Sequence, residues 1–253
     1  RAVSDINRVL QKVGQSWGLR LSLSDYHDDA LSPLRSEDCL RAFEHPETSR
    51  FFSFFEERIP QILETEEPDL IGFSLNYLSQ ALTTFALIGY LRRLVPAATI
   101  AVGGGLATSW KRSPVWSDSF RDVIDLWVDG PGEEPLLSFF EKGMHGESSR
   151  PRYDDLPLDS YLSPGRIIPY SASTGCYWRK CSFCPERAEG NQYRPVPPKQ
   201  AVGDLANLVT SHQPALIHLL DNAVSPALLK ELVRTPPGAP WYGFVRFTEH
   251  LAD

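Results

Sequence analysis

Residues 167–184 read Ile-Ile-Pro-Tyr-Ser-Ala-Ser-Thr-Gly-Cys-Tyr-Trp-Arg-Lys-Cys-Ser-Phe-Cys. The first seven of these residues predict a buried strand, and Gly175 lets the chain turn sharply where that strand ends. Three cysteines then fall within nine residues: Cys176, Cys181 and Cys184. A loop rich in thiols at the end of a strand predicts a metal or cluster site.

Cysteine chemistry allows three interpretations of this loop. In the first, the thiolates bind three irons of a 4Fe–4S cluster and leave one iron open, as catalytic metal sites do. In the second, they hold a structural zinc ion, whose fourth ligand would be His212, His218 or Cys39. In the third, they are ordinary core residues.

Downstream of the loop, helices and strands alternate. We expect strands over residues 215–220 and 241–247, and helices over residues 199–211 and 225–234. Together with the strand over 167–173, this gives three strands joined by two crossover helices. The pattern predicts the opening part of a parallel β/α barrel, since a closed barrel has eight strands.

The N-terminal half alternates in the same way. We expect helices over residues 4–13, 51–63, 79–95 and 134–142. We expect strands over residues 19–23, 70–74, 99–102 and 123–128, and a polar loop over 25–29. This order predicts an α/β fold with an open, mostly parallel sheet, whose ligands bind beyond the carboxyl ends of the strands.

The length of 253 residues predicts two domains, because a single core rarely grows that large. A segment rich in Gly, Pro, Ser and Asp separates the two sets of elements and predicts a linker. We therefore expect one domain over residues 1–145, a linker over 146–165 and a second domain over 166–253. Because the chain starts at Arg1 and stops just after a strand-like run, we expect it to be a piece of a longer protein.

Charge and composition exclude several classes of protein. The net charge of −7 argues against non-specific nucleic-acid binding, which needs a basic surface. The best apolar stretch, residues 81–95, is interrupted by arginines and is shorter than the roughly 18 residues of a membrane span. Clustered cysteines indicate a reducing compartment, so we predict a cytoplasmic protein with no membrane or nucleic-acid partner. The isolated Cys39 is predicted to be a small structural residue.

The cysteine loop resembles the cluster loop of radical S-adenosylmethionine (radical SAM) enzymes. The matching run is Ser173-Thr174-Gly175-Cys176, four residues, then Cys181-Ser182-Phe183-Cys184-Pro185. In that family three cysteines bind a 4Fe–4S cluster, whose open iron binds the amino and carboxylate groups of S-adenosylmethionine. One electron then cleaves this cofactor to a 5′-deoxyadenosyl radical. The common spacing leaves three residues between the first two cysteines, whereas this chain leaves four.

The resemblance implies further cofactor contacts. Phe183, just before the last cysteine, would lie near the adenine. Asp221 and Asn222 end the second barrel strand, where family members contact the methionyl amino group; the alternative is that Asp221 caps the following helix. Arg246 of the third strand would point at the cofactor or substrate cavity, and the alternative is a salt bridge at the rim with Glu249.

The N-terminal half resembles the Rossmann-like, cobalamin-binding-type domain that often precedes radical SAM barrels. The matching segments are residues 68–74, 102–105 and 129–133. The resemblance implies cobalamin contacts from Ser74, Gly103, Gly104 and Gly105. The alternative is that these glycines serve ordinary turns.

The resemblance thus implies a radical SAM enzyme that cleaves S-adenosylmethionine at a 4Fe–4S cluster. Its small-molecule or peptide substrate is not identified, and neither are further catalytic residues. Cobalamin-dependent methylation is implied if the N-terminal domain binds cobalamin, with flavodoxin or ferredoxin as the electron donor. The alternative is a non-catalytic module that binds an iron–sulfur cluster or zinc.

Overall fold

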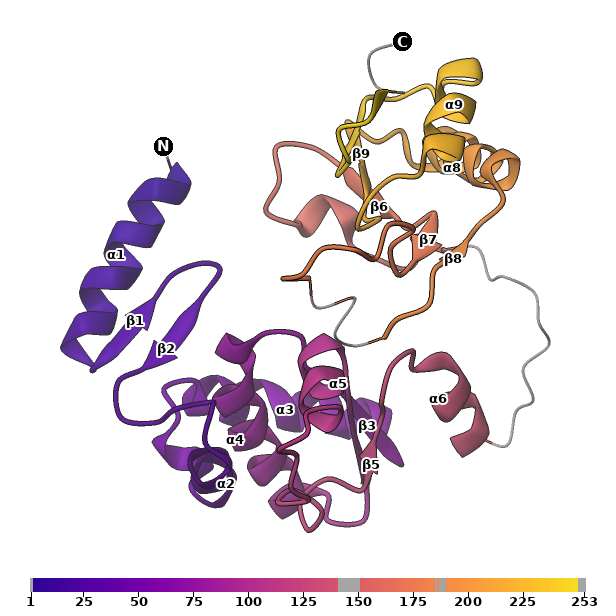
Figure 1. Cartoon of the computed structure of the whole chain (residues 1–253). Helices are drawn as coiled ribbons and strands as arrows, with labels where there is room; N and C mark the ends of the chain where they lie inside the picture. The colour runs from indigo at the N-terminus through magenta and orange to yellow at the C-terminus, as the bar shows by residue number, and fades with distance from the viewer. Residues whose placement is uncertain (1, 141–150, 185, 187–189, 250–253) are drawn as a thin grey trace. The chain divides into compact units, whose positions relative to one another are not determined.

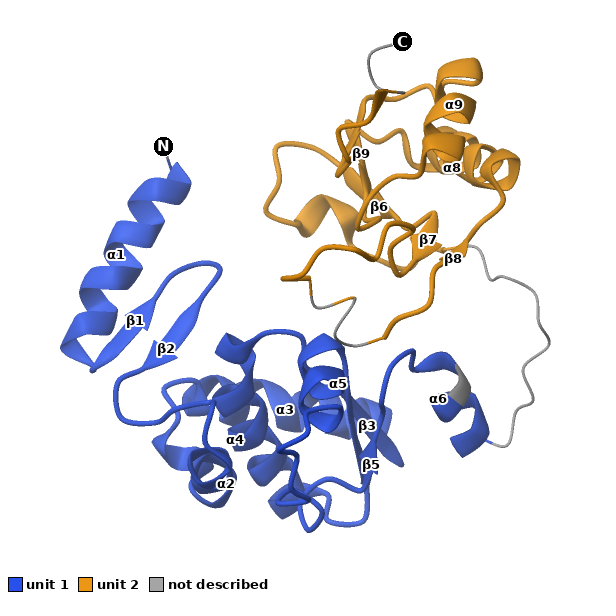
Figure 2. Cartoon of the chain, in the orientation of Figure 1, with its two compact units in different colours: residues 1–144 blue, residues 145–253 orange. Residues whose placement is uncertain are grey.

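The computed structural model describes residues 2–140, 151–184, 186 and 190–249. The chain divides into two compact units, residues 1–144 and 145–253 (Figures 1 and 2). Both are mixed α/β structures with small parallel sheets, and the described residues form no closed barrel. No helix in the described part of the chain is long and apolar enough to cross a membrane.

The first unit carries a three-stranded parallel sheet in the order β3-β4-β5. Its described elements are α1 (Ala2–Ser16), β1 (Leu19–Leu21), β2 (Tyr26–Asp28), α2 (Ser36–Glu44), η1 (Pro46–Thr48), α3 (Phe52–Glu66), β3 (Leu70–Ser74), α4 (Leu78–Leu94), β4 (Thr99–Gly103), α5 (Gly105–Lys111), β5 (Leu126–Trp127) and α6 (Glu133–Phe139). The predicted open parallel sheet with helical cover is confirmed here. Of the helix predicted over 134–142, the last two residues lie outside the described residues.

The core of the first unit forms between the sheet and α4. Ile100 and Val102 of β4 are fully buried, as are Phe85 and Ile88 of α4. Helix α4 also packs against α2 and α3. It is therefore enclosed on several sides, which explains why its apolar residues are not confined to one stripe.

The prediction of a polar loop over residues 25–29 is wrong. Residues 26–28 form β2, which pairs antiparallel with β1 as a hairpin separate from the parallel sheet. The Ser22 N–H donates to the Asp25 carbonyl at 2.9 Å and closes the turn between the two strands. Strand β1 falls within the strand predicted over residues 19–23, whereas β2 has only three residues and is too short for its alternation to stand out in the sequence.

The strand predicted over residues 123–128 is shorter in the structure, where β5 covers Leu126–Trp127 and Asp125 directly precedes it. The Asp125 carboxylate accepts hydrogen bonds from the Ile100 N–H at 2.7 Å and from the Arg92 guanidinium. Burial opposes ionisation, but these two donors hold the pKa of Asp125 below its ordinary value. Val123 and Ile124 pack into the core from the turn before the strand.

The second unit carries a parallel sheet in the order β10-β9-β6. Its described elements are η2 (Leu158–Ser160), β6 (Ile167–Tyr170), β7 (Ser173–Thr174), β8 (Arg194–Pro195), α8 (Pro198–His212), β9 (Leu216–Leu219), α9 (Pro226–Arg234) and β10 (Trp241–Gly243). Helices α8 and α9 are the predicted crossovers between consecutive parallel strands. The predicted first and third strands were too long, because β6 ends at Tyr170 and β10 at Gly243.

The two faces of this sheet differ in their cover. Ile168, Ile217 and Leu219 face the core that the sheet shares with α8 and α9. On the other face the His218 ring stacks on Tyr242, with centroids 4.1 Å apart. Tyr242 remains 45 % exposed, so its ring is only partly covered.

Residues 151–165, from the predicted linker, belong to the second unit, and Tyr153 and Leu158 pack against its core. The Tyr153 hydroxyl donates to the carbonyl of Pro169 in β6. Arg166 holds Asp159 by two hydrogen bonds of 2.7 Å each. The earlier part of the predicted linker, residues 146–150, lies outside the described residues.

Candidate functional site

The cysteine loop is closed at its base by a short antiparallel ladder. Ser173 pairs with Pro195 and Thr174 with Arg194, so β7 and β8 bracket the loop. Gly175 follows with φ +67°, and a Cβ there would lie 2.5 Å from the Gln192 carbonyl oxygen. Only glycine fits this close approach, which fixes the point where the loop leaves the strand.

The three loop cysteines are free thiols with intermediate burial. Their number and type fit a cluster that leaves one iron open, since thiolates are the usual cluster ligands. As the side chains stand, no three or more Cys, His, Asp or Glu residues in the described ranges are grouped closely enough to hold a metal ion. Cluster binding therefore requires the thiols to converge, and their role as ligands stays a prediction.

The three candidates for a fourth zinc ligand have other surroundings. Cys39 is fully buried in the core of the first unit, which confirms the predicted structural role. The His212 ring packs against Tyr153 in a T-shaped pair, and His218 stacks on Tyr242. None of them belongs to a metal-binding group within the described part of the chain.

We expect thiol reagents to distinguish Cys39 from the loop cysteines. Burial, with smaller contributions from Asp38 and Glu37, raises the pKa of the Cys39 thiol to about 12. The thiolate is the reacting form, so at about pH 8 the folded, metal-free protein should react at three cysteines and the unfolded protein at four. A disulfide reagent that releases a coloured thiolate counts them. A Cys39→Ser control should leave the folded count unchanged, and a folded count of four would contradict the prediction.

Asp221 joins the second strand of the unit to the base of the cysteine loop. Its side chain is buried, and its Oδ2 accepts from the Ala172 N–H at 3.0 Å. Its Oδ1 accepts from the Ser173 hydroxyl. The alternative helix-capping role is wrong, because Ser225 caps α9 by accepting from the Leu228 N–H at 3.2 Å. Asn222, in the same turn, is exposed.

Arg246 reaches the cysteine loop from the segment after β10. Its Cζ lies 3.3 Å from the ring centroid of Trp178, between the first two loop cysteines. Lys180 Nζ lies 4.7 Å from the same centroid. No ion pair between Arg246 and Glu249 is found among the described residues, so the contact with Trp178 takes the place of the alternative salt bridge. Sequence reasoning did not identify Trp178 as Arg246's partner.

Phe183 is 89 % exposed, although the loop around it is partly buried. A phenyl ring this exposed is available to cover a ligand at the loop. Its predicted contact with an adenine stays a prediction.

The candidate cobalamin contacts lie together at the carboxyl ends of β3 and β4. Ser74 and Gly103 are register partners. Asn76, which sequence reasoning missed, donates to the Ser74 hydroxyl at 3.0 Å and accepts from the Gly105 N–H at 2.9 Å. An asparagine two residues after the end of a predicted strand is a turn signal that could have drawn attention to it.

Local packing explains why residue 104 is a glycine without any cofactor. Its φ is +101°, and a Cβ would lie 2.6 Å from the Leu75 carbonyl oxygen. This supports ordinary turn chemistry at that glycine. The predicted cofactor contact therefore depends on Ser74, Gly103 and Gly105, which lie at the carboxyl ends of the strands.

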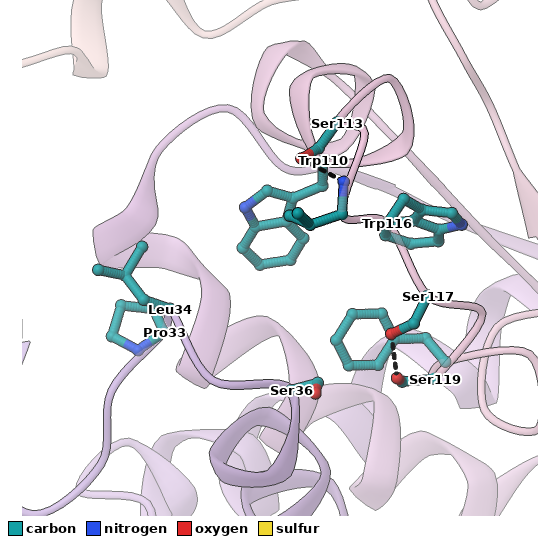
Figure 3. A pocket seen from close by; sticks show the side chains of 10 residues that line it. Pro33, Leu34, Ser36, Trp110, Ser113, Trp116, Ser117 and Ser119 are labelled. Atoms are coloured by element: carbon teal, nitrogen blue, oxygen red, sulfur yellow. Dashed lines mark hydrogen bonds between the residues drawn. The ribbon is translucent and has the colours of Figure 1, made fainter.

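Two cavities lie apart from these residues. One of about 190 Å³ in the first unit is lined by Pro33, Leu34, Ser36, Trp110, Ser113, Val115, Trp116, Ser117, Ser119 and Phe120 (Figure 3). The other, of about 280 Å³, lies in the second unit and is lined by Tyr153, Asp154, Leu156, Pro157, Leu158, Asp159, Ser160, Arg166 and His212. His212, a candidate zinc ligand, lines the second cavity, and the residues predicted to contact the cluster, S-adenosylmethionine or cobalamin line neither.

Comparisons of the chain with protein-family models, with curated proteins and with solved structures returned no match. The second unit gathers Asp221 and Arg246 at the cysteine loop, each through a contact to a residue of that loop or its base. The first unit brings Ser74 and Gly103 together at the carboxyl ends of β3 and β4.

Proposed function

We propose that the chain is the cluster-binding part of a radical SAM enzyme, which cleaves S-adenosylmethionine reductively to start radical chemistry on a small-molecule or peptide substrate. In this proposal the second unit is the opening part of a radical SAM β/α barrel. The first unit is a Rossmann-like domain of cobalamin-binding type. An electron carrier such as flavodoxin or ferredoxin supplies the electron, and methylation is the favoured reaction if cobalamin binds.

One observation carries the proposal: a closed loop with three free cysteines leaves the first strand of a parallel β/α sheet at its carboxyl end. Active sites of β/α barrels lie at that end. Three thiols in a single loop match a cluster with an open iron better than the four-ligand structural zinc sites. The second and third strands of the same sheet lead into Asp221 and Arg246, which makes the loop the meeting point of all three.

In this proposal different residues of the chain hold the cluster, brace the loop and contact the ligand. Cys176, Cys181 and Cys184 would hold three irons, and the bound cluster would pass one electron to the sulfonium of S-adenosylmethionine. Asp221 is buried and already accepts from Ala172 and Ser173, so it braces the loop. Exposed Asn222, in the same turn, is better placed to accept a hydrogen bond from a ligand's ammonium group.

The cobalamin part of the proposal depends on the edge formed by Ser74 and Gly103. A flat cofactor can approach backbone closely where glycines end a strand. Cobalt content of protein purified without oxygen tests this part separately from the cluster.

The cluster assignment predicts a visible absorption band that depends on the loop thiols. Protein reconstituted anaerobically with iron and sulfide should show the broad band of iron–sulfur ligation. Changing Cys176, Cys181 and Cys184 together to serine should remove that band, whereas Cys39→Ser should keep it because Cys39 lies in the core. A band that persists in the triple variant would discard the assignment.

Incubation of the reconstituted protein with S-adenosylmethionine and dithionite separates the enzyme from a non-catalytic module. Formation of 5′-deoxyadenosine supports the enzyme. An intact cluster without that product supports the module, and stoichiometric zinc in protein purified without added metal supports the zinc alternative.

A further inference from the structure

We infer that Arg246 is a positioning residue: by stacking on Trp178, it fastens the cysteine loop to the segment that follows the third strand. Two elements far apart in the sequence meet in this contact. The contact between Arg246 and Trp178 is observed whatever the function of the chain is, whereas its role in cluster assembly rests on the proposed function.

The stack is close enough to be a strong contact. The Arg246 Cζ is 3.3 Å from the Trp178 ring centroid, well inside the roughly 6 Å limit of cation–π contacts. Lys180 Nζ, at 4.7 Å, gives the same indole a second cation from within the loop. The planar guanidinium of arginine stacks on aromatic rings in a way that the lysine ammonium cannot.

The two partners differ in how firmly they are held. Arg246 lies two residues beyond Phe244, whose carbonyl accepts from the Val224 N–H at 2.8 Å. That bond ties the segment to the turn before α9. Trp178 lies in the cysteine loop, between Cys176 and Cys181. The described ladder pairs of this loop lie only at its base, in β7 and β8. The stack is therefore an anchor for the loop beyond its base, between its first two thiols.

Tryptic cleavage of metal-free protein after Lys180 tests the anchor, since cleavage requires the loop to open locally. Arg246→Ala should raise the cleavage rate roughly two- to thirty-fold, the range given by the strength of cation–π contacts. Arg246→Lys should restore part of the protection. Arg194→Ala, at an exposed arginine on β8, is the matched control and should leave the rate unchanged. Rates are divided by those of loop peptides of the same sequence, and mass spectrometry identifies the cleaved bond.

A double-mutant cycle decides whether Trp178 is the partner. If the stack is the anchor, Arg246→Ala combined with Trp178→Ala should cleave no faster than the faster single variant. Independent, multiplying effects would overturn the inference, and so would equal cleavage rates in wild type and Arg246→Ala. Circular dichroism confirms that each variant is folded. If Trp178→Ala does not fold, Trp178→Leu, which keeps an apolar side chain but removes the aromatic face, replaces it in the cycle.

Reconstitution distinguishes a failure of the inference from a failure of the proposed function. Arg246→Ala should retain less iron and a weaker visible band than wild type, with Arg246→Lys in between. A wild type that takes up no cluster but shows the coupled change in cleavage overturns the proposed function and supports the anchor. A wild type with a full cluster and an unchanged Arg246→Ala spectrum overturns the positioning role.

Discussion

The variant Gly89→Ala is expected to lose about 3 kcal/mol or more of the free energy of unfolding. Gly89 lies in α4, where α4 crosses α2, and a Cβ there would come 1.9 Å from the carbonyl oxygen of Phe43. The obstacle is backbone, so no side-chain rotation relieves it and α2 must move away from α4. Alanine favours a helix over glycine by only about 1 kcal/mol, so the clash decides the sign.

Denaturant unfolding followed by circular dichroism measures this loss. The matched control is Gly203→Ala in α8, where an added Cβ meets no atom within 4 Å. That variant should be unchanged or gain up to about 1 kcal/mol. If Gly89→Ala unfolds at the same denaturant concentration as wild type, the close crossing of α2 and α4 is wrong.

Gly89 also shows how far the sequence could be read. The helix around it was predicted over residues 79–95 and found as Leu78–Leu94, because a long apolar pattern gives a strong signal. The reason for a glycine in its interior could not be predicted. That reason is the carbonyl of Phe43, which is distant in sequence and reaches Gly89 only in the folded chain.

Most errors in the predicted fold concern short elements. Helices α2 and α5 were not predicted, and residues of β2 were predicted as a loop. Each has nine residues or fewer, so few periods of any pattern are present. The third strand of the second unit was predicted through residue 247 because its last four residues are mostly apolar. In the structure Phe244 and Phe247 are 68 % and 97 % exposed, so burial of these two apolar side chains does not hold the segment in the sheet.

The candidate site was predictable where chemistry is local and unpredictable where it depends on contact. The spacing of the cysteines and the glycine before them located the loop, and Gly175 proves sterically required. The ladder between β7 and β8, the stack on Trp178 and the bridging role of Asn76 each join segments separated in the sequence. Periodicity and spacing carry no information on such pairs.

Asp221 is the second residue whose replacement should have a large effect. Truncation to alanine removes both acceptors at once and leaves the Ala172 N–H buried without a partner. An unsatisfied buried donor, together with the lost hydrogen bonds to a charged group, predicts a loss of about 2–4 kcal/mol. Asp221→Asn should lose less, because its amide oxygen can accept from Ala172 while its amino group donates to the Ser173 hydroxyl.

Asn222→Ala is the control, since the two residues are neighbours in one turn and were predicted to share one role. Asn222 is exposed, so its truncation should change the free energy of unfolding by no more than about 0.5 kcal/mol. Thermal and denaturant unfolding of the metal-free variants measure both effects without any cofactor. Equal stability of Asp221→Ala and wild type would show that Asp221 does not brace the loop, and would return it to the set of residues available to bind a ligand. A large loss for Asp221→Ala beside an unchanged Asn222→Ala would instead leave Asn222 as the ligand-facing residue of the pair.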